Sequence, residues 1–339
     1  MAISITTKQL PDAIKRILKA GLVPFVTGSP GIAKSASVQQ VAESFNLEFK
    51  DIRLAQSDPT ELNGFPTIVE NIAQYIPMNI FPITSTPLPE GKDGWLICLE
   101  ELNSASLAVQ AAAYKLILDR KVGEYDLHKN VAMVATGNLA TDKAIVNRMG
   151  TAMQSRLVHL VVSIEPKDWL EWADKSEVDY RVKSYIGFRP DNLFKFDPNH
   201  NDLTFPCPRT WEFVSKIIKP ETAISYELLP LITGCVGEGT GREFFEYCDI
   251  FPRLPTIASI KASPGLVPIP DEPSILYALA GLISHNITVG NIDSIMQYVN
   301  RLPKEFQVIT IQSILRKDVA LRTAQPIINW IKVNATMLM

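Results

Sequence analysis

In the first half of the chain, short apolar runs alternate with longer segments whose apolar residues recur at helical spacing. The runs are rich in apolar and β-branched residues, as strands are. They cover residues 22–26, 47–54, 95–99, 131–136 and 157–164. Between them, segments such as 9–20 and 33–44 place their apolar residues on one helical face. This alternation predicts an α/β fold with a five-stranded parallel sheet covered by helices on both faces.

The pattern changes after Glu165, where strand-like runs become rare and helical spacing dominates. Six prolines fall between residues 252 and 273, a density that disfavours both helix and central strand, so we expect a mostly extended connection there. Helical spacing then resumes. The expected domains are an α/β core (1–165), a helical domain (166–251), the proline-rich connection (252–273) and a C-terminal helical region (274–339).

The composition narrows the class of protein. With 46% hydrophobic and 20% charged residues, the chain can bury a full core, which excludes wholesale disorder. Its 33 basic and 36 acidic side chains give no global reason to expect nucleic acid or a membrane surface as the main partner. Four scattered cysteines predict neither a zinc site nor a disulfide framework. No signal peptide or membrane-spanning run is visible, so a cytoplasmic location is expected.

One loop has the composition of a phosphate-binding loop, because it follows a predicted strand and opens a predicted helix. It consists of Gly28, Ser29, Pro30, Gly31, Ile32, Ala33, Lys34 and Ser35. Backbone N–H groups would surround the phosphates, Lys34 would reach the β and γ phosphates, and the Ser35 hydroxyl would hold Mg²⁺. Ala33 replaces the usual glycine, and its methyl group is accommodated if Ala33 has helical dihedral angles. The alternative is an ordinary turn containing an incidental lysine.

Further candidate residues follow in order along the chain, which favours the phosphate-loop interpretation. Glu100 and Glu101 end the apolar run 95–99; Glu100 would support Mg²⁺, and Glu101 would polarise the attacking water. Asn138 ends the next run with an amide able to bind the γ-phosphate and that water. Arg156 precedes the fifth run, with Arg148 as a competitor. Taken singly, each of these residues is also common in a solvated turn or on a surface.

Together these motifs resemble the AAA+ ATPases, and more narrowly the MoxR-like branch with its phage and prophage members. GSPGIAKS is similar to that branch's phosphate loop, LEELNSAS to its LDEINRA segment, and residues 130–157 to its sensor-1 strand and arginine-finger helix. The resemblance covers most of residues 10–215. It implies that Asn138 is sensor 1, that Arg156 reaches a neighbouring subunit's nucleotide, and that Arg209 is sensor 2 in a helical lid.

The resemblance also implies ATP and Mg²⁺ as cofactors, a homo-oligomeric ring, most often hexameric, and chaperone-like remodelling of a partner protein, for example one with a von Willebrand factor A domain. For a phage-encoded chain the location would be the host cytoplasm. Glu100 stands where the family has aspartate. Because Mg²⁺ is demanding in its geometry, the resemblance supports nucleotide binding more directly than turnover.

Two other functions remain open at the level of the sequence. A nucleotide-gated scaffold would bind ATP and barely hydrolyse it, and a DNA motor or helicase loader would use the insert at 121–130. A second insert, 61–83, resembles the family's helix-2 insert. Its apolar residues, Tyr75, Ile76, Ile80 and Phe81, either pack on the core or contact a substrate.

Overall fold

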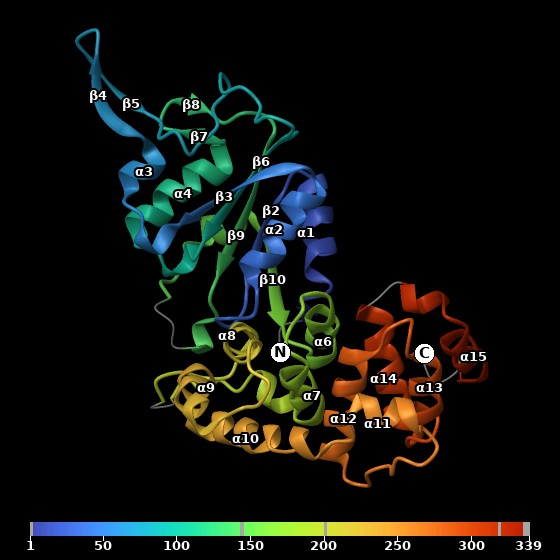
Figure 1. Ribbon diagram of the computed structural model, residues 1–339. Coiled ribbons are helices and arrows are strands. Elements are labelled where there is room, and N and C mark those ends of the chain that lie inside the picture. Colours follow the sequence, from blue (N-terminus) through green and yellow to red (C-terminus); the bar gives the residue numbers. More distant parts are fainter. Residues whose placement is uncertain (1–2, 143–145, 200–201, 318–319, 335–339) are drawn as a thin grey trace. The chain divides into compact units, whose positions relative to one another are not determined.

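The computed structural model describes residues 3–142, 146–199, 202–317 and 320–334. The chain divides into two compact units, residues 1–164 and 165–339 (Figure 1). Residues 143–145, within the segment that resembles the sensor-1 and arginine-finger region, and residues 335–339 of the expected C-terminal helical region lie outside the described residues.

The first unit is built on a parallel sheet of six strands in the order β1-β10-β2-β9-β6-β3; all of them except β1 are labelled in Figure 1. The strands are β1 (Ser4–Thr6), β2 (Val23–Thr27), β3 (Leu47–Arg53), β6 (Gly94–Glu100), β9 (Val131–Gly137) and β10 (Leu157–Ser163). The expected α/β sheet is therefore present, but the predicted number of five strands is wrong by one. The additional strand, β1, is three residues long and forms only by pairing with β10 at the sheet's edge.

Helices cover both faces of this sheet. They are α1 (Leu10–Lys19), α2 (Lys34–Ser44) and α4 (Leu107–Asp119), with the short elements η1 (Leu54–Gln56), α3 (Pro59–Asn63), η2 (Leu102–Ser104), η3 (Ala140–Asp142) and α5 (Thr151–Gln154). Along β6, Ile97 and Leu99 join a core cluster with Ala113 of α4, while Leu96 and Cys98 are buried beneath the opposite face. A strand buried on both faces reads as an unbroken apolar run, which is why the sequence pattern found it.

Two small hairpins extend from this unit: β4 (Phe65–Val69) with β5 (Ile72–Ile76), and β7 (Lys121–Val122) with β8 (Tyr125–Asp126). In the first hairpin, Ile68 is 76% exposed, and Tyr75 and Ile76 are also exposed, whereas Phe81 is only 3% exposed. Packing on the core is thus the correct interpretation for Phe81 and for Ile80, which contacts the core cluster, but not for Tyr75 and Ile76.

The second unit is helical. Its helices are α6 (Pro166–Lys175), α7 (Tyr180–Phe188), α8 (Pro208–Ile218), α9 (Leu229–Val236), α10 (Glu238–Cys248), α11 (Ile257–Ala262), α12 (Pro273–Asn286), α13 (Ile292–Val299), α14 (Lys304–Lys317) and α15 (Gln325–Asn334). Short 3₁₀ turns η4 (Pro190–Leu193), η5 (Tyr226–Leu228), η6 (Phe251–Arg253) and η7 (Ala320–Thr323) join them. Helix α7 packs on α12, and α6 on α14, so segments 166–251 and 274–339 share one compact unit.

The extended conformation predicted for residues 252–273 is wrong in its central part, which forms α11. The six residues of α11 include no proline, and the Thr256 side chain caps the helix by accepting a hydrogen bond from the Ser259 N–H at 3.1 Å. An N-terminal cap of this kind offsets the loss of the first backbone hydrogen bonds. The prolines therefore lie on either side of a short proline-free segment, and that segment forms a helix.

None of the helices in the described part of the chain has the length and apolar character needed to span a bilayer.

Candidate nucleotide site at the carboxyl edge of the sheet

The loop between β2 and α2 is held in a tight turn. A Cβ atom at Gly28 would lie 2.5 Å from Ile32 Cδ1 and 3.3 Å from the carbonyl oxygen of Val162, so a larger residue does not fit without displacement. Gly31 has φ +78°, a conformation that glycine adopts at little cost. The turn therefore favours glycine at both positions, by close approach at Gly28 and by backbone conformation at Gly31.

Lys34 begins α2 and folds back over the loop. Its Nζ donates hydrogen bonds to the carbonyl oxygens of Gly28 at 2.6 Å and Ser29 at 2.9 Å. The ammonium charge thus lies against the loop backbone, at the N-terminal end of the helix, where anions are favoured. Ser35 follows in the first turn of α2 and is half-buried.

The structure corrects the expectation for Ala33. This residue precedes α2 with φ 66° and ψ 29°, which is left-handed and not helical. Its carbonyl oxygen accepts hydrogen bonds from the N–H and the hydroxyl of Ser37, so the residue is fixed in this conformation by the start of the helix. A left-handed L-residue costs roughly 1–2 kcal/mol, a cost that glycine avoids.

Glu100 is the last residue of β6, and its side chain is 14% exposed. The Arg53 Nε lies 3.8 Å from an oxygen of Glu100 and 3.8 Å from an oxygen of Asp51. In the sheet, Asp51 pairs with Cys98, and Arg53 pairs with Glu100. The expected magnesium carboxylate therefore has an arginine counter-ion on the neighbouring strand. The sequence signal for this counter-ion is the alternation of Asp51 and Arg53 along β3, which places both side chains on one face of the strand.

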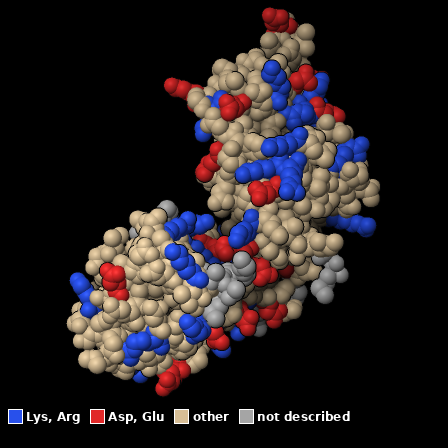
Figure 2. All heavy atoms as spheres, turned by 90° about the vertical axis from the view of Figure 1, so that its right-hand side faces the viewer, with Lys and Arg blue, Asp and Glu red and all other residues tan. Residues whose placement is uncertain are grey.

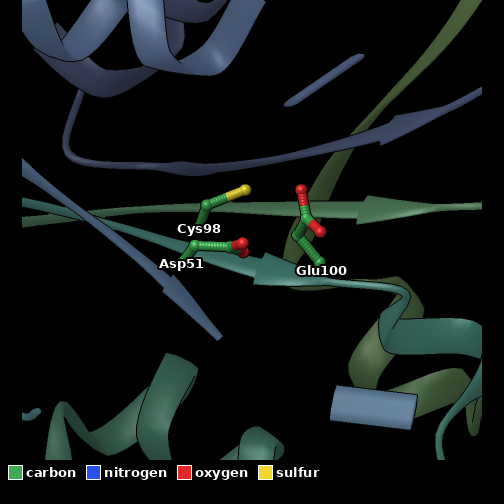
Figure 3. A group of neighbouring side chains, drawn as sticks. All are labelled: Asp51, Cys98 and Glu100. Carbon is green, nitrogen blue, oxygen red and sulfur yellow. The ribbon is translucent and has the colours of Figure 1, made fainter. Parts of the chain in front are cut away.

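Asp51, Cys98 and Glu100 form a compact group whose potential ligand atoms lie within 4.8 Å of one another (Figure 3). Burial, and then the charge of Glu100, raise the pKa of the Asp51 carboxyl, while Arg53 lowers it. Burial and the same two carboxylates raise the pKa of the Cys98 thiol well above its usual range. Because a protonated thiol is a poor metal ligand, the group offers hard oxygen donors with Arg53 as their counter-ion.

Glu101 lies just beyond the strand in a left-handed conformation, with φ 56°, and it is exposed. Its N–H points to the Thr136 hydroxyl of β9 at 3.4 Å. Non-glycine residues with positive φ cost free energy and are concentrated at functional sites. The two adjacent glutamates differ in environment: Glu100 is paired with Arg53, and Glu101 is exposed to solvent.

Asn138 directly follows β9 and is held by a residue that sequence reasoning missed. The Asn103 side chain donates to the Asn138 carbonyl at 2.8 Å and accepts from the Asn138 N–H at 3.1 Å. The Asn138 side chain itself lies 3.5 Å from the Ser104 hydroxyl, a long hydrogen bond. An asparagine three residues beyond the first glutamate was visible in the sequence, but only the fold brings it against Asn138.

The three candidate arginines are all exposed. Arg156 donates to the Ala152 carbonyl at 3.0 Å and lies 5.4 Å from the centre of the Tyr114 ring, so its guanidinium rests on its own chain. Arg148 lies in an irregular segment before α5. Arg209 is the second residue of α8 in the helical unit. The roles expected for these arginines in the mechanism stay predictions.

The site residues of the first unit converge because their strands are parallel neighbours. Strand β9 lies between β2 and β6, with Thr27 paired with Gly137 and Leu99 with Ala135. The loop 28–35, Asn138 and the glutamates therefore leave the sheet at the same carboxyl edge, where open α/β sheets bind ligands. This edge combines backbone donors and a lysine suited to phosphate, a carboxylate suited to Mg²⁺, and a second, solvent-exposed carboxylate.

No family model and no curated protein matches the chain. Among solved structures, it is similar to a Cytophaga hutchinsonii protein provisionally described as an ATPase, with 14% identity over 91% of this chain and 81% of that chain, and a TM-score of 0.36. It is also similar to a proline-to-glycine mutant of Thermotoga maritima RuvB, with 13% identity over 81% of this chain and 82% of that chain, and a TM-score of 0.38. At these sequence identities and TM-scores, the similarity gives no information about activity.

Proposed function

We propose that this chain is a Mg²⁺-dependent ATP hydrolase of the AAA+ type, more narrowly of the MoxR-like branch, which acts in a homo-oligomeric ring. One observation carries the proposal: a phosphate-type loop, two glutamates and an asparagine leave three adjacent parallel strands at one edge of the sheet. Each motif alone is common, and their convergence in space is what the chemistry of phosphoryl transfer requires.

Nucleotide binding would use the loop between β2 and α2. Its backbone N–H groups and Lys34 would bind the β and γ phosphates in place of the two loop carbonyls that Lys34 now contacts. The Ser35 hydroxyl and the Glu100 carboxylate are hard oxygen donors of the kind that Mg²⁺ prefers, and they fit this ion. When bound, Mg²⁺ would neutralise charge on the phosphate oxygens.

Hydrolysis would use the open glutamate. The Glu101 carboxylate would accept a proton from water as the water oxygen bonds to the γ-phosphorus. The bond from that phosphorus to the β–γ bridging oxygen breaks, and ADP leaves with the electron pair. The Asn138 amide would orient the water and the γ-phosphate. Because Asn103 fixes the backbone of Asn138, little reorganisation is needed at this step.

The ring would complete each site with an arginine from the next subunit. Arg156, with Arg148 as the alternative, would stabilise charge that develops on the transferred phosphoryl group, and Arg209 would act as sensor 2 in a lid. A hexamer is the stoichiometry that the sequence resemblance favours. In such a ring one chain alone is nearly inactive, because its site lacks the trans arginine.

The output would be chaperone-like remodelling of a partner protein, with a von Willebrand factor A domain protein as one candidate. The β4–β5 hairpin supports a protein partner, since Phe65, Ile68 and Ile72 are all more than 60% exposed. Apolar surface of this kind marks protein interaction sites. The face drawn in Figure 2 carries basic and acidic side chains intermixed in both units, unlike a uniformly basic nucleic-acid track.

A second candidate, the nucleotide-gated scaffold, is favoured by one observation: Glu100 is engaged by Arg53 and is longer than the family's aspartate. Steady-state phosphate release separates the two functions. For an ATPase, Glu101→Gln should bind ATP and retain it unhydrolysed, whereas Glu100→Asp should turn over at least as fast as the parent with a sharper Mg²⁺ dependence. Parental turnover in Glu101→Gln would remove Glu101 from its role, and ATP binding without phosphate release by the parent would favour the scaffold.

A further inference from the structure

The buried side-chain amide of Asn103 forms hydrogen bonds with the backbone of Asn138, a candidate catalytic residue. Asn103 lies in η2, two residues after Glu101, and is 6% exposed. Its single side chain satisfies both the N–H and the C=O of Asn138. Two hydrogen bonds to one residue fix the peptide planes on both sides of it, and so fix the direction in which the Asn138 side chain leaves the backbone.

The close approach of these two segments depends on Gly137. A Cβ atom at this position would lie 2.5 Å from Asn103 Oδ1 and 2.6 Å from the Phe25 ring. Any other residue would therefore displace the amide or the aromatic ring. The contact between Asn103 and Asn138 is built into the end of β9 and is not an incidental surface contact.

The backbone of the same turn also holds the segment that carries the candidate arginines. The Asn103 carbonyl accepts a hydrogen bond from the Asn147 N–H at 2.7 Å, and the Asn147 side chain donates to the Ala105 carbonyl at 2.8 Å. Arg148 follows directly. The chain then continues through Met149 and Met153, both buried in the core cluster, to Arg156. Both arginines thus belong to a segment, residues 147–156, that is anchored on the Asn103–Ala105 turn.

We propose that Asn103 is a positioning residue that couples two nucleotide sites. Through its side chain it holds Asn138 in its own subunit's site, and through its backbone it holds segment 147–156, which would serve the neighbouring subunit's site. Contact with the γ-phosphate would restrain Asn138, and that restraint is passed to the segment because bonds of 2.7 to 3.1 Å to the same turn leave little freedom between them. This inference rests on the proposed function.

Three variants of the full chain test the coupling. Asn103→Ala removes both bonds to Asn138, and Asn147→Ala removes the bond to Ala105. Asn192→Ala is the matched control: Asn192 is also 6% exposed, and its amide bonds to the Tyr185 hydroxyl at 2.7 Å in the helical unit. We expect Asn103→Ala and Asn147→Ala to lower kcat about 10- to 100-fold with unchanged ATP affinity, and Asn192→Ala to lose stability but not kcat.

Mixing with Lys34→Ala subunits assigns each asparagine to a site, provided that native mass spectrometry shows mixed rings. An Asn147→Ala subunit keeps its own phosphate loop and Asn138, so a Lys34→Ala neighbour with a correctly held arginine segment should restore activity. In an Asn103→Ala subunit, Asn138 of its own site is no longer held in position, so the same neighbour should not restore activity. Parental kcat in both variants, or full rescue of Asn103→Ala, would overturn the coupling.

A second readout keeps this result separate from the proposed function. If the wild-type chain binds ATP without hydrolysing it, hydrogen exchange with a non-hydrolysable ATP analogue still reports the coupling. The analogue should slow exchange in residues 147–154 of the wild type and leave it unchanged in Asn103→Ala. Equal protection in both chains would overturn the inference, and so would a wild-type chain that binds no nucleotide.

Discussion

At the scale of single residues, the residue types of the candidate site could be read from the sequence, and their conformations and contacts could not. The glycines of the loop and the order of Lys34, Glu100 and Asn138 are visible in the sequence, because each comes after an apolar run. The left-handed Ala33 and the partner of Asn138 are not, since a dihedral angle and a contact across strands belong to the folded backbone.

Ala33→Gly should stabilise the chain. The left-handed conformation penalises a Cβ atom, and its removal should outweigh the extra flexibility of glycine in the unfolded chain, for a net gain of up to about 1 kcal/mol in the free energy of unfolding. Urea unfolding measures this gain. Ala36→Gly is the matched control, because Ala36 is exposed inside α2, where glycine should cost about 1 kcal/mol. Destabilisation of similar size in both variants would contradict a strained Ala33.

At the scale of elements, the sequence pattern located the main strands of the sheet, but it missed the short edge strand β1 and helix α11. The strands at 94–100 and 131–137 lie within one residue of their apolar runs, because burial on both faces leaves a continuous signal. The edge strand at 47–53 also lies within one residue of its run, although most of its residues are only partly buried or exposed. Strand β1 has no such signal, since a short edge strand needs β10 beside it. Helix α11 was hidden by the prolines around it.

The β4–β5 hairpin should tolerate the loss of its apolar side chains. Ile68→Ala removes a side chain that is 76% exposed, so the free energy of unfolding should change by less than about 0.5 kcal/mol. Phe81→Ala, at a position 3% exposed in the same insert, should cost about 3–5 kcal/mol. Urea unfolding of both variants makes the comparison. A large loss in Ile68→Ala would show that the hairpin packs within its own chain, and would remove it as a partner surface.

At the scale of the whole molecule, the residues of the proposed mechanism are divided between two compact units. The loop, both glutamates, Asn138, Arg148 and Arg156 lie in the α/β unit, whereas Arg209 lies in the helical unit. An arginine can act on a neighbouring subunit's nucleotide only in an assembly of several chains. No pattern within one sequence fixes that assembly, because a subunit interface depends on which surfaces meet.

The most direct test of the account is Mg²⁺-dependent phosphate release by the purified chain, compared with Lys34→Ala prepared in the same way. Lys34 supplies the loop's ammonium group, so its loss should abolish binding of the β and γ phosphates. Lys167→Ala, an exposed lysine of the helical unit, is the control for loss of one positive charge. We predict that the parent and Lys167→Ala release phosphate, with a specific activity that rises with protein concentration, and that Lys34→Ala stays at background. Equal release by the parent and Lys34→Ala, or none by the parent at any concentration, would contradict the account.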